Sequence, residues 1–514
     1  MVRRISPVWI VVLLAALSLI VAACGGAESP AEGVTSAGGN TRQASDVLVG
    51  AQGQSGAQVA QQASPTPGSY GPIVNPTALP TTAAPTVPAT LTPTETATAT
   101  LTVTPGPSPT PTLTPTATLT PAETATPTPS PTQTETPTPE PTATLGGTPL
   151  PALRIDQMGI QIDSDISMDD YEVALWHAQN LGMRWVKLQF AWDILEPTPN
   201  QFSDVMYRYR LFVQKAHDNG FKVLVSIAKA PDWARSTTEE DGPPSDPSAL
   251  SSMITRMLGE IRTDYLGASY ISAIEIWNEP NLMREWHGGT LSGADYMRYF
   301  GAAYNVIRAA EDGPNITVVT AGLAPTGVND GVNAVDDRTY LRQMYQAGLT
   351  SDVYQNIAIG VHPYGAWNPP DARCCINSGQ GYDDHPTFFF LDTLEDYHDI
   401  MLNYGDTTRP MWATEFGWAT YDNLYKSDGS PAVAPESQPF FNYLNEEQQA
   451  NYIMRAFELG QSLPYLGVMT LWNLNFAYPA YVDASDPRAG YSVWGTMPDP
   501  ERFAYTLLSR SPRQ

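Results

Sequence analysis

From Arg154 to the C-terminus, short apolar runs alternate with longer segments of helical periodicity. Most of the runs are almost continuously apolar, which is typical of parallel strands that helices cover. Eight runs are expected to be strands, at 158–162, 185–190, 221–227, 271–277, 316–322, 357–364, 411–415 and 467–473.

The segments between these runs carry helix signals. Segments 168–181 and 204–219 place apolar residues on one face, and each is followed by a glycine. Pro247 opens a third helix, and Asn445 with Gln448 resembles a capping box that opens another. Eight repeats of strand and helix predict an α/β fold, a closed (β/α)8 TIM barrel. A doubly wound open sheet is the alternative, but no glycine-rich phosphate loop follows the first strand.

Composition divides the chain into three parts. Residues 1–24 hold an apolar run behind two arginines, too short for a comfortable membrane span and typical of a secretory signal peptide. Residues 25–150 have low complexity and become Thr- and Pro-rich, so they are expected to form a disordered, extended linker. Residues 151–514 are expected to form the barrel domain, a length that suits one large barrel with insertions.

The end of the leader resembles the lipobox of bacterial lipoproteins. It reads Val-Ala-Ala-Cys at 21–24 and is followed by two glycines, with Val where Leu is usual. The resemblance implies that Cys24 receives a lipid and anchors the chain to the membrane. An ordinary cleaved signal peptide is the alternative. We therefore expect the barrel at the extracellular face of the bacterial cell membrane, on a stalk, or secreted.

The charge bears on the expected partners, and the cysteine content bears on the expected disulfides. The formal net charge is −26, and such a surface repels nucleic acid, so we expect no nucleic-acid partner. We also expect a monomer. The chain has three cysteines, too few for a disulfide framework. For the adjacent Cys374 and Cys375, two free thiols are favoured over a vicinal disulfide, which needs a strained ring.

Two predicted strands end in a glutamate at a point where the chain breaks. The fourth strand runs into Trp-Asn-Glu-Pro-Asn at 277–281, and the seventh runs into Thr-Glu-Phe-Gly-Trp at 414–418. Catalytic residues of such barrels lie at the C-terminal ends of strands, and strands four and seven lie roughly opposite each other. Glu279 and Glu415 are therefore expected to face each other, as the two carboxyl groups of a glycoside hydrolase do.

Both segments resemble the signatures of the clan of retaining glycoside hydrolases that carry catalytic glutamates on strands four and seven. The resemblance is closest to glycoside hydrolase family 39, and family 5 is next. It implies that Glu279 is the acid/base and Glu415 the nucleophile. Similar segments occur at other strand ends: Trp185–Leu188 with Trp192, Ala230–Trp233, His362–Tyr364 and Thr470–Trp472.

The resemblance also implies residues that bind the substrate. Asn278 would hydrogen-bond a sugar 2-hydroxyl, although capping a turn is the alternative. His362 and Tyr364 would line the cleaved subsite, with the Tyr364 hydroxyl near Glu415, and Trp472 would be the platform under the reacting sugar. Core or rim packing is the alternative for these three.

Three further residues complete the expected substrate site. Family 5 commonly has an arginine at the end of the second strand, and Lys187 is the nearest match here. Trp192 and Trp233 follow predicted strand ends, where aromatic faces suit pyranose rings, with rim packing as the alternative.

The sequence thus predicts a retaining hydrolase of β-linked O-glycosidic bonds in poly- or oligosaccharides at the cell surface, without cofactor or metal. Retention requires carboxyl groups about 5–5.5 Å apart, whereas about 6.5–9.5 Å indicates inversion. A non-catalytic carbohydrate-binding surface lipoprotein on a degenerate barrel is the alternative, but such proteins normally lose one carboxylate. A metal-dependent barrel hydrolase is disfavoured, because the six histidines form no metal-binding pair in the sequence. Long loops leave endo or exo action open.

Overall fold

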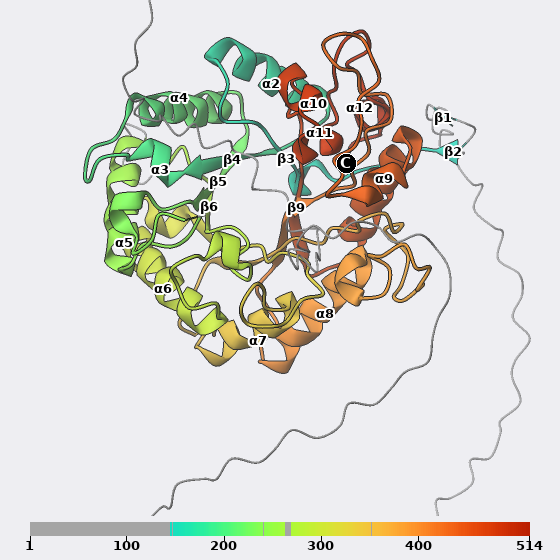
Figure 1. The fold of residues 1–514 in the computed structure, drawn as a ribbon. Helices are drawn as coiled ribbons and strands as arrows, with labels where there is room; N and C mark the ends of the chain where they lie inside the picture. The colour runs from blue at the N-terminus through green and yellow to red at the C-terminus, as the bar shows by residue number, and fades with distance from the viewer. Residues whose placement is uncertain (1–143, 146–147, 240, 263–268, 351) are drawn as a thin grey trace, which may run out of the picture. The chain divides into compact units, whose positions relative to one another are not determined.

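The computed structural model describes residues 144–145, 148–239, 241–262, 269–350 and 352–514. Eight parallel strands close into a barrel in the order β10-β3-β4-β5-β6-β7-β8-β9, with helices around the outside (Figure 1). The strands are β3 (Met158–Gln161), β4 (Trp185–Ala191), β5 (Lys222–Ala228), β6 (Ala273–Ile276), β7 (Thr317–Thr320), β8 (Ile357–Val361), β9 (Met411–Phe416) and β10 (Leu466–Leu471).

The prediction of a TIM barrel is confirmed, and all eight expected strands are present. Pairing is in regular parallel register around most of the ring, and the shifts between β9 and β10 are an exception. Ahead of the barrel, β1 (Thr144–Leu145) pairs with β2 (Thr148–Pro149). The predicted leader, the lipidation site Cys24 and nearly all of the predicted linker lie outside the described residues.

The helices begin where their caps predict. Ser167 caps α2 and Asp246 caps α5, whose first residue is Pro247, while Asn445 and Gln448 form a complete capping box on α9. The longer helices are α2 (Met168–Asn180), α4 (Asp204–Asp218), α5 (Pro247–Glu260), α6 (Gly293–Ala309), α7 (Asp337–Gln346), α8 (Phe390–Asn403), α9 (Glu446–Ser462) and α12 (Phe503–Arg510).

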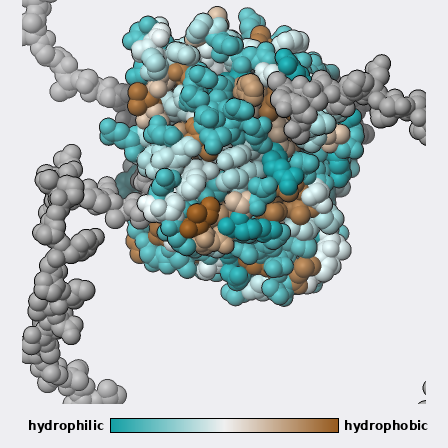
Figure 2. Space-filling model, turned by 90° about the vertical axis from the view of Figure 1, so that its right-hand side faces the viewer, coloured by the Kyte–Doolittle hydropathy of each residue, from teal (hydrophilic) through white to brown (hydrophobic). Residues whose placement is uncertain are grey.

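Short helices shape the loops at the ends of the strands. They are α3 (Trp192–Leu195), α10 (Pro479–Asp483), α11 (Pro487–Tyr491), η2 (Ile155–Gln157), η3 (Asp232–Ala234), η4 (Met283–Glu285), η5 (Gly313–Asn315), η6 (Pro386–Phe388) and η7 (Pro439–Asn442). Among the described helices, none is long and apolar enough to cross a membrane. Figure 2 shows mostly hydrophilic side chains on one face, with hydrophobic ones in separate small patches.

The two largest apolar clusters of the described residues hold the barrel and its loops together. The larger one fills the space between strands and helices, and burial of its aliphatic and aromatic side chains is the main stabilising term. The second one joins the loops that follow β8, β9 and β10, through Tyr364, Phe440, Phe441, Trp472 and Tyr491. These long loops are therefore packed against one another.

The loop after β8 carries Cys374 and Cys375, which are joined in a vicinal disulfide. This differs from the favoured interpretation of two free thiols. Arg373, next to them, pairs with Asp392 and Glu395 of α8, and the Cys374 backbone N–H donates to Asp392. These contacts fix the bridge against the start of α8.

Candidate active site

The chain breaks the fourth barrel strand where it places Glu279. Strand β6 ends at Ile276, and Trp277 and Glu279 then adopt φ values of 75° and 45°, a region that L residues adopt rarely. The Glu279 backbone N–H donates to the Gly322 carbonyl at 3.0 Å, and the Asn281 side chain bonds both polar groups of Ala324. The loop is thereby tied to the segment that follows β7, and Glu279 lies at the mouth of the barrel.

Glu415 lies on β9 and is fully buried. Its Oε1 accepts from Lys187 Nζ at 2.9 Å, and its Oε2 accepts from the Tyr364 hydroxyl at 2.9 Å. A cation and a hydroxyl donor thus hold the two oxygens, and charge-assisted bonds of this kind fix a carboxylate strongly. The predicted proximity of the Tyr364 hydroxyl to Glu415 is present in the structure.

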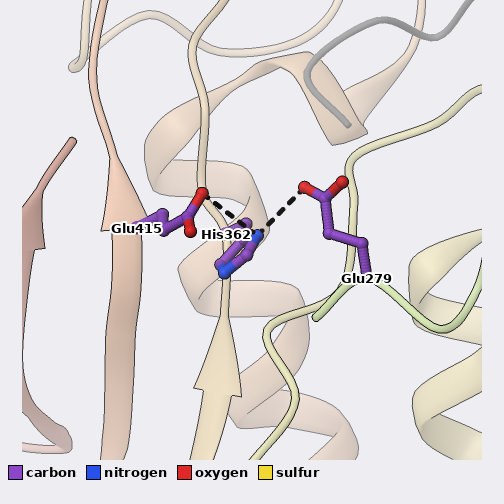
Figure 3. A group of neighbouring side chains, drawn as sticks. All are labelled: Glu279, His362 and Glu415. Atoms are coloured by element: carbon purple, nitrogen blue, oxygen red, sulfur yellow. Dashed lines mark hydrogen bonds and ion pairs between the residues drawn. The ribbon is translucent and has the colours of Figure 1, made fainter. Parts of the chain in front are cut away.

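His362 lies between the two glutamates (Figure 3). Its Nδ1 is 3.1 Å from Glu279 Oε1 and 3.9 Å from Glu415 Oε2. One ligand atom from each of the three residues lies within 4.8 Å of the other two. The two carboxyl groups therefore meet at one rim, with one oxygen of Glu279 within 4.8 Å of one oxygen of Glu415.

Burial and neighbouring charges oppose each other at this centre. Burial acts to lower the pKa of Lys187, but Glu275 and Glu415 outweigh it and raise that pKa, so Lys187 stays a cation. Burial also acts to lower the pKa of His362, and the charges of Glu415 and Glu279 raise it on balance. Burial, with Glu415 nearby, raises the pKa of Tyr364 well above its usual value, so its hydroxyl remains a donor.

Asn278 and Trp472 carry polar atoms that the described protein leaves unbonded. Both atoms of the Asn278 amide, and Nε1 of Trp472, are buried without a hydrogen-bond partner among the described residues. Buried polar groups normally have partners, so such groups mark positions for a ligand or water. The arrangement agrees with the predicted sugar contacts, which stay predictions.

Trp192 and Trp233, both expected in the substrate site, differ in their exposure to solvent. Trp192 is fully buried in the main core, and its indole N–H donates to Glu196 Oε2 at 2.9 Å. Trp233 is 36% exposed, donates to the Glu196 carbonyl at 2.8 Å, and meets Trp192 edge-on. Trp233 therefore offers an accessible ring, whereas Trp192 supports it from below, which is the packing alternative for Trp192.

Lys187 needs a revised interpretation. It is fully buried, and its ammonium group contacts Glu415 at 2.9 Å, Glu275 at 3.0 Å and the Thr414 carbonyl at 3.2 Å. These protein groups match the three hydrogens of an ammonium. We therefore assign Lys187 to holding Glu415, which corrects the expectation from the sequence that it binds the substrate.

Two neighbours of the pair were missed from the sequence. Arg284 of η4 lies 2.9 Å from Glu279 Oε2 and 3.5 Å from Glu285 Oε1. Burial raises the pKa of Glu285 to about 8, against the opposing charges of Arg284 and Lys229. Glu275, on β6, contacts Lys187. For Glu275, the sequence signal was its charge inside the apolar run Ile-Glu-Ile at 274–276.

The cluster also has a donor set that suits a divalent cation, with one imidazole nitrogen and two carboxylate oxygens. Glu279 Oε1 and Glu415 Oε2 each have a protein partner within 3.1 Å, so the observed contacts serve the carboxyl groups themselves. Two facing carboxyl groups equally suit acid–base and nucleophilic catalysis.

A closed (β/α)8 barrel with two carboxyl groups facing each other at the strand ends has the arrangement that a glycoside hydrolase needs. Residues 157–454 match the family described as cellulase (glycosyl hydrolase family 5). Because this match covers more than half of the chain, the chain belongs to glycosyl hydrolase family 5. The prediction of a glycoside hydrolase on a (β/α)8 barrel is confirmed, and the family that matches is family 5, the second of the two expected, rather than family 39.

Solved structures with this fold have low sequence identity to the chain. A family 39 glycoside hydrolase from Bacteroides cellulosilyticus WH2 is 17% identical, with 70% of this chain and 63% of that chain covered and a TM-score of 0.48. The chain thus spans less than two thirds of that protein. A GH5_18 protein from Bifidobacterium longum subsp. infantis is 14% identical, with coverages of 70% and 78% and a TM-score of 0.49.

An endo-beta-1,4-glucanase from Xanthomonas axonopodis pv. citri is 14% identical, with 69% of this chain and 98% of that chain covered and a TM-score of 0.43. At these values the likenesses carry no argument about this chain. No curated protein matches the chain.

Proposed function

We propose that the barrel is a retaining hydrolase of β-linked O-glycosidic bonds in poly- or oligosaccharides, with Glu279 as acid/base and Glu415 as nucleophile. The observation that carries the proposal is the convergence of Glu279, Glu415 and His362 within 4.8 Å at the mouth of a closed barrel. Such a short separation suits direct attack by a carboxylate on the anomeric carbon, whereas inversion needs room for a water between carboxylate and sugar.

In the first step, Glu279 gives its proton to the glycosidic oxygen while Glu415 attacks the anomeric carbon. The bond between that carbon and the leaving oxygen breaks, and a glycosyl ester of Glu415 forms. Lys187 and Tyr364 orient the attacking carboxylate through their contacts at 2.9 Å. They remain bound to a group that loses its negative charge as the ester forms, so their main contribution is orientation before attack.

In the second step, the Glu279 carboxylate takes a proton from water, and the water oxygen attacks the same carbon. Glu415 leaves as a carboxylate, and two inversions give net retention. His362 and Arg284 contact the two oxygens of Glu279 at 3.1 and 2.9 Å, so both stabilise the negative charge that Glu279 carries at this stage.

The binding groups favour a neutral polysaccharide. Asn278 presents an unbonded amide beside Glu279, Trp472 lies among the aromatics of the second cluster, and Trp233 offers an exposed ring farther out. Aromatic faces stack on pyranose C–H faces, and a buried amide bonds hydroxyls. The cellulase description of the family makes β-glucans the first substrates to test.

Location and assembly are proposed from the sequence. The lipobox-like segment ending at Cys24 and the Thr/Pro-rich stretch support a lipid-anchored enzyme carried on a stalk at the outer face of the cell membrane. The charge of −26 supports a protein without nucleic-acid partners, and we propose that it is monomeric. Labelling of cells with a lipid precursor, compared between wild type and Cys24→Ser, tests the anchor.

The activity test uses the full chain on a panel of β-glucans and aryl β-glycosides. We expect turnover by the wild type, with the β-anomer as the first product seen by proton NMR of a β-linked substrate. Glu415→Ala should lose activity, and Glu279→Ala should keep activity mainly on substrates with good leaving groups and gain rate with azide.

Glu436→Gln, at an exposed glutamate, is the matched control. Absence of turnover on every glycan, together with retained binding, would favour the non-catalytic carbohydrate-binding alternative. An α-anomer as the first product would indicate inversion and refute the assigned roles.

A further inference from the structure

The interior of the barrel changes from apolar to polar along the strands. A ring of apolar side chains points inward from seven strands, among them Trp185, Ala273 and Trp412. Side chains two residues apart on a strand point the same way, so the next inward layer is set by the following positions. In that layer the buried polar side chains are Gln161, Lys187, Ser226, Glu275, Thr414 and Thr470.

This layer holds a third buried carboxylate directly beneath the catalytic pair. Glu275 is fully buried, its Oε2 lies 3.0 Å from Lys187 Nζ, and its Oε1 accepts from the Gly322 backbone N–H at 3.1 Å. Burial acts to raise the pKa of Glu275, but Lys187 and His362 outweigh it and lower that pKa, so Glu275 is ionised. A buried ion pair adds little net stability over apolar packing, so its presence here calls for another reason.

One series of contacts, the nucleophile arm, links Glu275 to Glu415 through Lys187. Lys187 lies between the Glu275 and Glu415 carboxylates, at 3.0 and 2.9 Å. Its ammonium has no rigid fork of donors to align itself, unlike a guanidinium. Glu275 therefore supplies the second anchor that fixes where the Lys187 charge lies relative to Glu415.

A second series of contacts, the acid/base arm, links Glu275 to Glu279 through Thr414 and His362. His362 Nε2 lies 3.1 Å from the Thr414 hydroxyl and 3.9 Å from Glu275 Oε1, and the Thr414 hydroxyl helps to lower the pKa of Glu275. An ionised carboxylate only accepts, so the single hydroxyl hydrogen of Thr414 goes to Glu275. Thr414 must then accept from His362, which places a hydrogen on Nε2.

This assignment fixes the other side of the imidazole. With Nε2 as donor to Thr414, His362 Nδ1 faces Glu279 Oε1 at 3.1 Å with one shared proton between them. That proton either belongs to Glu279 and points at a neutral imidazole, or belongs to an imidazolium and points at a carboxylate. In both cases, the Glu279–His362 pair holds the proton that the departing sugar needs.

We propose that Glu275 is a positioning residue for both catalytic glutamates, acting on Glu415 through Lys187 and on Glu279 through Thr414 and His362. The inference rests on the proposed function. Besides Glu275 and Lys187, the titratable groups that face the pair are Glu415, Tyr364, Tyr491, Arg284 and Glu285.

Substrates with different leaving groups separate the two arms. A dinitrophenyl glycoside leaves without a proton, whereas an oligosaccharide needs one from Glu279. Thr414→Val removes the acceptor of His362 and should slow oligosaccharide cleavage about 10-fold or more, with the dinitrophenyl glycoside nearly unaffected. Thr414→Ser keeps the hydroxyl and is the matched control. Lys187→Met should slow both substrates, and Lys187→Arg should restore part of the loss.

Glu275→Gln, which removes one charge with little change in shape, tests the shared anchor. We expect kcat to fall about 10²-fold on both substrates while KM changes less than about 3-fold. The alkaline limb of the pH–rate profile should move down by about 0.5–1 unit, since a negative charge no longer favours the proton on the Glu279–His362 pair. Circular dichroism and thermal unfolding confirm that each variant is folded.

The outcomes separate a failure of the Glu275 proposal from a failure of the proposed hydrolase function. An active wild type whose folded Glu275→Gln and Thr414→Val variants keep wild-type kcat and pH limbs overturns this inference alone. Equal loss on both substrates in Thr414→Val overturns the acid/base arm. A wild type that turns over no glycoside overturns the proposed function and this inference with it.

Discussion

Arg284 should affect the pH range over which the Glu279–His362 pair keeps its proton. Its guanidinium lies 2.9 Å from Glu279 Oε2, and the residue belongs to η4, in the loop that follows β6. A cation in this place favours the ionised form of a carboxyl group. The ionised form is needed in the second step of the proposed mechanism, whereas the protonated form is needed in the first. Arg284→Gln should therefore move the alkaline limb of kcat/KM to higher pH.

The size of this movement follows from the geometry. Two unit charges about 4 Å apart interact by about 4 kcal/mol at an effective dielectric constant of about 20, which corresponds to about 3 pH units. The Arg284 side chain is 21% exposed and is shared with Glu285 at 3.5 Å, so water and the second carboxyl group reduce its effect. We expect a movement of about 1 unit, at the lower end of the range for an opposite charge in contact.

The assay is the pH dependence of kcat/KM on an oligosaccharide, which reports groups of the free enzyme. Arg284→Lys keeps the charge and should leave the limb near its wild-type position. Arg298→Gln, at an arginine with a 61% exposed side chain on α6, is the control for a change in overall charge. An alkaline limb that stays in place or moves to lower pH in Arg284→Gln would refute the reasoning. The expected direction is opposite to that for Glu275→Gln, so one assay compares both.

Three further variants test other parts of the structure. Asn278→Ala should lower kcat/KM about 10²-fold while the free energy of unfolding changes by less than about 1 kcal/mol. The reason is that neither polar atom of this amide has a partner among the described residues. Kinetics check the first result, and chemical denaturation checks the second. Gly322→Ala should abolish activity in a folded protein, because its Cβ would lie 2.1 Å from His362 Cδ2, and a normal circular dichroism spectrum with retained activity would contradict this.

Glu285→Gln should raise the thermal midpoint more at pH 7 than at pH 4. Burial raises the pKa of Glu285 to about 8, so holding this acid protonated in the fold costs stability as the pH rises above its ordinary value, by about 1–3 kcal/mol at neutral pH. Equal gains at both pH values would contradict the raised pKa.

Much of the fold was predictable from local patterns. The eight strands and the caps of α5 and α9 follow from apolar runs, from Pro247, and from Asn445 with Gln448, all of which act within a few residues. The meeting of Glu279 with Glu415 also followed, since strand order in a closed barrel fixes which strand ends face each other. These inferences need the order of the elements but no atomic contact.

The partners of those glutamates were decided by the tertiary structure. Lys187 and Glu415 are 228 positions apart, and their contact depends on how the strands are staggered when the barrel closes. Trp192 and Trp233 have similar settings in the sequence, yet Trp192, which begins α3, is fully buried, whereas Trp233, on η3, is 36% exposed. The sequence determined the barrel and its pair of acids, whereas side-chain direction and strand stagger decided which buried charges support that pair.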